Sequence, residues 1–94
     1  MDEGVHLYIM YDIEDNAIRG RLAARLMFYG MRRIQYSVFE GVVSPREKLT
    51  IVEEIDGLAL GDNDKVHIVE LCARCVKKRI VIGDMPEERE HLVL

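Results

Sequence analysis

The stretch VHLYIMYDIED, residues 5–15, holds an apolar run that ends abruptly in three acids. Residues 6–11 are too few for an ordinary helix and are rich in side chains that suit a pleated sheet, so they predict a strand. Because polar residues hardly interrupt the run, we expect a central strand that is buried on both faces. The rest of the chain is interpreted outward from this strand.

The three acids after the strand have different expected roles. Asp15 suits the N-cap of a following helix, because its carboxylate can accept hydrogen bonds from the first free amides. Glu14 is most simply a solvated loop acid. Asp12 adjoins a buried strand, where a carboxylate is costly unless a cation or hydrogen-bond donors meet it. Asp12 is therefore the leading candidate for chemistry.

Composition predicts a globular chain, with 94 residues, 49% of them hydrophobic and 32% charged. This length suits one domain whose small core would gain stability from dimerisation. No apolar run reaches the length of a membrane span, and acids stand where a signal peptide would be basic. We therefore expect a cytoplasmic homodimer without membrane association.

Charge is unevenly distributed, although the formal net charge is only −4. No acid occurs between Asn16 and Phe39, while five arginines do. Arginine matches phosphate with two parallel hydrogen bonds, so the cluster predicts backbone-directed binding of RNA or double-stranded DNA, the alternative being a solvated helix face. The candidate nucleic-acid-binding residues are Arg19, Arg21, Arg25, Arg32 and Arg33.

Two helices are predicted from periodicity and capping signals. Residues 16–29 place Ile18, Leu22, Leu26 and Tyr29 on one face, and Gly30 suits the helix end. Ser44-Pro45-Arg46-Glu47 is a capping box that begins a second helix, whose buried stripe we expect to comprise Leu49, Val52 and Ile55.

The remaining strands are predicted at 32–43, Lys65–Leu71 and Lys78–Gly83, the first being either continuous or broken. Their order predicts an α+β, ferredoxin-like βαββαβ sandwich over residues 1–83, with an additional C-terminal strand. The tail, residues 84–94, is expected to dock on the partner protomer. An extra strand at 78–83 or in the tail would pair with a partner's sheet edge.

Cys72 and Cys75 form a single Cys-x-x-Cys motif. Zinc needs four ligands, which this chain would supply only as two half-sites from a dimer or by recruiting histidine. A redox dithiol normally begins a helix, whereas this pair is expected between two strands, so a reduced turn is the favoured interpretation.

Several of these motifs together resemble the CRISPR-associated Cas-two family. The resemblance covers roughly residues 5–83 and rests on Tyr11-Asp12-Ile13, the run 33–41 with the sequence RIQYSVFEG, and the Cys-x-x-Cys turn. It implies a ferredoxin-like homodimer, a metal-dependent endonuclease and partner of the Cas-one integrase in spacer acquisition. The implied cofactor is magnesium, with manganese as an alternative.

The resemblance also implies the roles of site residues. Asp12 matches the acid that faces the dimer axis and holds the metal ion with its counterpart. Tyr11, Ser37 and Phe39 match catalytic positions beside it. The alternatives are a non-catalytic scaffold that binds duplex DNA and bridges integrase subunits, a plain ferredoxin-like binding module, and a toxin-like RNase of similar fold.

Overall fold

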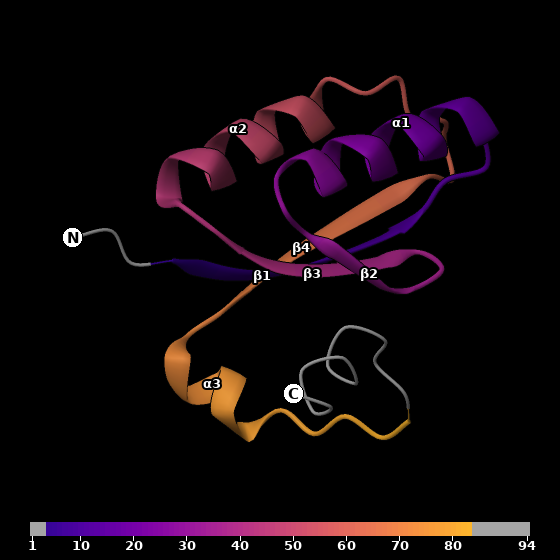
Figure 1. Ribbon diagram of the computed structural model, residues 1–94. Helices are drawn as coiled ribbons and strands as arrows, with labels where there is room; N and C mark the ends of the chain where they lie inside the picture. Colours follow the sequence, from indigo (N-terminus) through magenta and orange to yellow (C-terminus); the bar gives the residue numbers. More distant parts are fainter. Residues whose placement is uncertain (1–3, 84–94) are drawn as a thin grey trace.

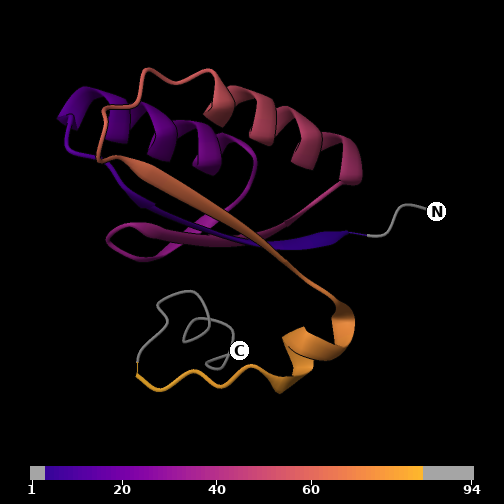
Figure 2. The ribbon, with the colours of Figure 1, turned by 180° about the vertical axis from the view of Figure 1, so that it is seen from behind.

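The computed structural model describes residues 4–83 and has a ferredoxin-like arrangement, as predicted. Its sheet is antiparallel, with strand order β2-β3-β1-β4. Helices α1 and α2 cover one face of the sheet, and α3 lies beyond the other face (Figures 1 and 2). The elements are β1 (Val5–Asp12), α1 (Asn16–Phe28), β2 (Arg32–Gln35), β3 (Val38–Val43), α2 (Pro45–Asp56), β4 (Lys65–Leu71) and α3 (Ala73–Lys78).

Strand β1 is central, pairing with β3 on one side and β4 on the other. Its alternate residues Leu7, Ile9 and Tyr11 are buried beneath the helices, while Tyr8 and Met10 on the opposite face are only half-buried. The expectation of burial on both faces is therefore wrong for the single chain, because α1 and α2 cover one face only. Phe39 of β3 lies at the centre of the core and is fully buried.

The predicted capping signals are confirmed at both long helices. The Asp15 carboxylate accepts a hydrogen bond from the amide of Ile18 at 2.9 Å. In the capping box, the Glu47 amide donates to Ser44 Oγ at 3.0 Å, and the Ser44 amide donates to Glu47 Oε1 at 2.9 Å. These bonds satisfy first-turn amides that have no partner within the helix.

The buried stripe of α2 differs from the prediction. Ile51 and Ile55 are buried, whereas Leu49 and Val52 are 64% and 37% exposed. The helix face that packs on the sheet carries residues 51 and 55, which lie one turn apart. Leu49 and Val52 fall outside this face.

The run 32–43 is broken into two strands of a hairpin by a turn at Tyr36 and Ser37. A register irregularity between Arg33 and Gln35 marks a β-bulge in the edge strand β2. Of the two alternatives for this run, the broken strand is confirmed, and side chains do not alternate strictly beyond Gln35, since a bulge and a turn each reorient the side chains that follow.

The strand expected over Lys78–Gly83 is not formed, because α3 extends through Lys78 and residues 79–83 contain neither helix nor strand. Arg79 instead reaches back to the sheet, donating to the Tyr8 hydroxyl at 2.7 Å and to the Glu40 carboxylate at 2.6 Å. The predicted tail, 84–94, lies outside the described residues. Within 4–83, no helix has the length and apolarity that crossing a membrane requires.

Candidate functional site

A small pocket of about 180 Å³ lies where β1 ends, α1 begins and the β2–β3 hairpin turns. It combines two guanidinium groups with a phenolic hydroxyl and an amide, a set of hydrogen-bond donors that suits an anion. Its lining residues are Tyr11, Asn16, Arg19, Gly20, Arg33 and Tyr36.

Tyr11 contributes a hydroxyl that has no hydrogen-bond partner among the described residues, although the side chain is only 6% exposed. Its ring stacks on Phe39 at a centroid distance of 6.3 Å, and its amide donates to the Ser37 carbonyl at 3.0 Å. Burial raises the pKa of the Tyr11 hydroxyl, while the charge and the donor groups of the nearby Arg33 guanidinium, and then the charge of Arg19, partly offset this effect. The hydroxyl therefore stays protonated and able to donate.

Arg19 supports the loop that leaves β1. Its Nη1 donates to the carbonyl oxygens of Ile13, at 2.6 Å, and Glu14, at 3.3 Å, and its Nη2 contacts the side chain of Asn16. These bonds fix both the guanidinium group and the loop immediately after Asp12. Arg19 is thus held in place before any ligand arrives, which lowers the entropy cost of binding.

Arg33 lies across the pocket and is exposed. Its guanidinium carbon is 5.2 Å from the centroid of Phe39 and 5.9 Å from that of Tyr36, and Arg19 is also 5.9 Å from the Tyr36 ring. The aromatic faces orient both cations. Within residues 4–83, Arg33 has no carboxylate partner, so its charge is available to a phosphate.

Asp12 is the exposed last residue of β1, opposite Lys65 of β4 in the sheet register. Its carboxylate makes no hydrogen bond or ion pair with any described residue. In the described part of the chain, no group of three or more His, Cys, Asp or Glu side chains is arranged to hold a metal ion. Magnesium takes six oxygen ligands, of which the Asp12 carboxylate is one candidate.

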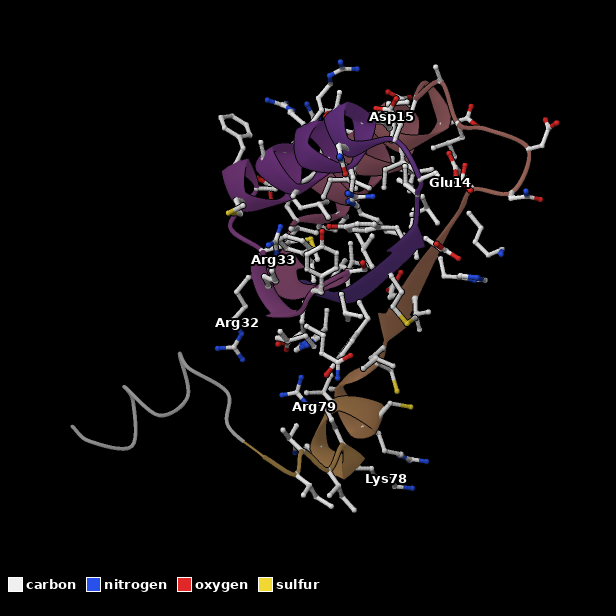
Figure 3. The ribbon with its side chains drawn as sticks, turned by 90° about the vertical axis from the view of Figure 1, so that its right-hand side faces the viewer. Glu14, Asp15, Arg32, Arg33, Lys78 and Arg79 are labelled. Atoms are coloured by element: carbon white, nitrogen blue, oxygen red, sulfur yellow. The ribbon has the colours of Figure 1, made fainter. Side chains whose placement is uncertain are left out.

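The other three predicted arginines lie away from this pocket. Arg21 lines a separate groove between α1 and α2. Arg25 forms an ion pair with Glu54 of α2, with Nε to Oε1 at 2.9 Å. Arg32 points to the sheet face opposite Arg33 (Figure 3) and pairs with Glu40 at 3.1 Å.

Glu40 is a buried carboxylate, 3% exposed, that sequence reasoning did not single out. It accepts hydrogen bonds from Arg79 and from Arg32, and His6 Nε2 lies 2.6 Å from it. Burial raises the pKa of Glu40, but the hydrogen bonds from Arg79 and Arg32 outweigh burial, so the pKa lies below its ordinary value. This cluster fastens residue 79 to the sheet.

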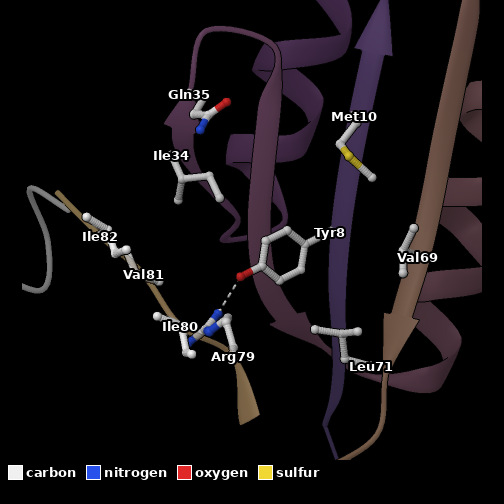
Figure 4. A pocket seen from close by; sticks show the side chains of 10 residues that line it. All are labelled: Tyr8, Met10, Ile34, Gln35, Val69, Leu71, Arg79, Ile80, Val81 and Ile82. Carbon is white, nitrogen blue, oxygen red and sulfur yellow. Dashed lines mark hydrogen bonds between the residues drawn. The ribbon is translucent and has the colours of Figure 1, made fainter. Parts of the chain in front are cut away.

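A larger groove of about 560 Å³ opens beside that cluster, between the uncovered face of the sheet and residues 79–82 (Figure 4). Its floor includes Tyr8 and Met10, and its outer wall is Ile80, Val81 and Ile82. Ile80 and Ile82 are 82% and 93% exposed. Such a concentration of exposed apolar surface is typical of an interface.

Of the residues predicted from the sequence, the structure brings Tyr11, Arg19 and Arg33 together in the pocket. The Phe39 ring stacks on Tyr11 and the Ser37 carbonyl accepts from the Tyr11 amide, whereas Asp12 does not line the pocket. The sequence-based prediction had listed these residues without placing them together. It missed Asn16 and Tyr36 as pocket residues. In a continuous strand the alternation of side chains would put Tyr36 on the face opposite Arg33, but the turn at 36–37 brings Tyr36 to the same pocket as Arg33. The Tyr36-Ser37 pair carried no strong turn signal such as Asn-Gly.

Similarity to known proteins shows the family of this chain. The family described as CRISPR associated protein Cas2 matches residues 5–79. The chain is 36% identical to CRISPR-associated endoribonuclease Cas2 1 of Archaeoglobus fulgidus, over 85% of this chain and 84% of that protein. It is 37% identical to CRISPR-associated endoribonuclease Cas2 2 of Methanospirillum hungatei, over 96% and 99%.

Two further proteins extend the comparison. A protein of Thermoproteus tenax named CRISPR-associated endonuclease Cas1/endonuclease Cas2 fusion is 29% identical, over 87% of this chain and 32% of its own length. The crystal structure of a hypothetical protein, TT1823 from Thermus thermophilus, superposes with a TM-score of 0.71 at 27% identity, covering 89% of this chain and 96% of that one.

Proposed function

The chain belongs to the CRISPR associated protein Cas2 family, and from this membership we propose that it acts in spacer acquisition beside a Cas1-type integrase and cleaves RNA phosphodiesters. Two relatives are named endoribonucleases, and the Thermoproteus tenax relative is named as a fusion with Cas1. The observation that carries the proposal is the pocket in which Arg19, Arg33 and the Tyr11 hydroxyl converge.

In this proposal the pocket holds a phosphate of the nucleic-acid backbone. Arg33 and Arg19 neutralise its charge, and the Tyr11 hydroxyl donates to one of its oxygens. Guanidinium groups engaged by a phosphate carry no base readout, so binding in this proposal is directed to the backbone and sensitive to salt.

The proposed cofactor is magnesium, held by Asp12 of two protomers of a homodimer. The exposure of Asp12 and its lack of a partner in residues 4–83 leave the carboxylate free for this role. Bound magnesium would polarise a phosphodiester and lower the pKa of a coordinated water. Asp12 would orient that ion beside the phosphate that Arg19 and Arg33 hold.

The proposed dimer buries the groove beside Ile80 and Ile82. Two such side chains exposed to water by more than four-fifths favour a partner surface there. Replacing Ile82 with Lys should give a monomer by light scattering across a dilution series. If the variant and the native protein were both monomeric, the dimer and the shared metal site would be lost together.

The nuclease proposal is tested with Asp12→Asn. The variant should keep its fold, dimer and nucleic-acid affinity but cleave RNA in magnesium no faster than the native protein does in EDTA. Glu14→Gln is the matched control, since Glu14 is an exposed acid in the loop just after β1, and the resemblance assigns it no role in holding the metal. An Asp12→Asn preparation that cleaves at the native rate would remove the catalytic assignment.

The second candidate function is a non-catalytic scaffold that bridges integrase subunits and binds duplex DNA. The fusion relative favours it, because covalent linkage to Cas1 is consistent with a constant structural partner. In this case Asp12→Asn would leave spacer acquisition intact in cells, whereas Arg33→Ala would impair it. The two variants therefore separate cleavage from scaffolding.

A further inference from the structure

The two cysteines lie together at the beginning of α3, outside the pocket and the groove described above. Cys72 is the residue before the helix and Cys75 is in its first turn, and both are exposed. The sequence had suggested a turn between two strands, which weakened a redox interpretation. The structure removes that objection, because the pair begins a helix and residues 79–83 form no strand.

The geometry of the turn suits a disulfide. The amide of Val76 donates to the Cys72 carbonyl at 3.0 Å, which closes a helical turn from residue 72. Residues three apart in such a turn have Cα atoms about 5 Å from each other. This spacing lies within the range of about 4.4–6.8 Å that disulfides adopt.

The surroundings of the pair are cationic. Arg74, Lys77 and Lys78 lie on the same short helix and are exposed, and the helix contains no acid. The pKa of Cys72 is lowered, because the backbone amide of Cys75, the Cys75 thiol and the backbone amide of Arg74 stabilise its thiolate. The pKa of Cys75 is raised, because its thiol donates to Cys72. The two thiols therefore differ in reactivity.

We propose that Cys72 and Cys75 form a reversible redox dithiol, with Cys72 as the nucleophile and a low-molecular-weight disulfide as the oxidant. The Cys72 thiolate attacks one sulfur of that disulfide, forming a mixed disulfide and releasing one thiolate. The Cys75 thiolate then attacks Cys72 sulfur, closing the internal disulfide and releasing the second thiolate. Two protein thiols are oxidised, one external disulfide is reduced, and the two protons go to solvent.

A metal site explains the pair less well. Zinc requires four ligands, and the described residues of this chain provide no group of three candidate ligands. The basic helix instead suits an anionic oxidant, and oxidised glutathione carries carboxylates that such a surface attracts.

The test uses the full chain, whose two cysteines are its only thiols. Reduced protein is incubated with oxidised glutathione, quenched in acid, alkylated and weighed by mass spectrometry. The native chain should lose two hydrogen atoms and retain no glutathione. Cys75→Ser should trap one glutathione on Cys72, and Cys72→Ser should react at least about tenfold more slowly. Both replacements are at exposed positions, and circular dichroism confirms that each variant is folded.

Two results would overturn the proposal. In one, the native chain accumulates two separate glutathione adducts, which means that Cys75 does not reach Cys72. In the other, the two single variants react at the same rate, which means that both cysteines are ordinary surface thiols.

Discussion

Replacing Tyr11 with Phe separates the stability of the fold from the function of the pocket. The native hydroxyl is buried without a partner in the described structure, and such a group costs about 1–3 kcal/mol. Phe keeps the ring that stacks on Phe39. We therefore expect Tyr11→Phe to raise the free energy of unfolding by about 1 kcal/mol, the lower end of that range. Urea denaturation at unchanged m value measures this quantity.

The matched control is Tyr8→Phe, on the opposite face of the same strand. The Tyr8 hydroxyl accepts a hydrogen bond from Arg79 at 2.7 Å, so its removal should lower stability by about 1 kcal/mol. The two variants thus change stability with opposite signs.

The same Tyr11→Phe variant should bind RNA more weakly, by about tenfold, because one hydrogen bond to phosphate is worth roughly 1.4 kcal/mol here. Fluorescence anisotropy with a labelled oligonucleotide at fixed ionic strength measures the loss. The reasoning fails if Tyr11→Phe destabilises the protein as Tyr8→Phe does, since the hydroxyl would then have a partner. It also fails if affinity is unchanged, since no phosphate would then contact it.

Three further outcomes are expected. Gly20→Ala should stabilise α1 by about 0.5–1 kcal/mol in thermal unfolding, because an added Cβ meets no atom within 4 Å, yet weaken RNA binding by narrowing the pocket. Arg33→Gln should reduce the slope of log RNA affinity against log salt concentration by about 1. Arg46 is on α2 and does not line the pocket, so Arg46→Gln should leave the rate of RNA cleavage unchanged. Glu40→Gln should lower the free energy of unfolding in urea by about 3 kcal/mol, because Arg79, Arg32 and His6 would lose a buried carboxylate while staying partly hydrated. Glu54→Gln should lower it by less than about 1 kcal/mol, because the Arg25–Glu54 pair lies at the surface. In the folded protein the pKa of Glu40 is lowered from 4.5. The contribution of Glu40 to the free energy of unfolding is therefore complete above that pH and is lost as the pH falls through the lowered pKa.

The elements most visible in the sequence were those that local chemistry specifies. The capping box at Ser44 and the cap at Asp15 use partners only three residues away, so their signals survive in a single sequence. Strand β4 was predicted with its observed limits, Lys65–Leu71, because loop residues precede it and polarity changes after it.

The sequence predicted the presence of a basic cluster, but not the direction in which each arginine side chain points. Arg25 meets a carboxylate 29 residues away in the chain, at Glu54, and Arg32 meets Glu40 across the hairpin. Such pairings depend on how α1 packs beside α2 and on which face of β2 a residue takes. The acid-free run alone does not determine either one. The strand expected at 78–83 was wrong because α3 extends through Lys78 and the Arg79 side chain bonds to Tyr8 and Glu40, so the apolar residues that follow pair with no strand in the described structure.

The two outer strands of the sheet differ in a way that limits self-association. Strand β2 is four residues long, is interrupted by a bulge and carries Arg32 and Arg33, features that discourage another strand from joining. Strand β4 is seven residues long and pairs with β1 in unbroken register, so its far edge is regular in the described structure. In the described structure the sheet therefore has one edge, that of β4, to which a further strand could readily add. If two copies joined edge to edge through β4, neither copy would keep such an edge exposed. Association by strand addition would then stop at a pair and would not continue into a fibre.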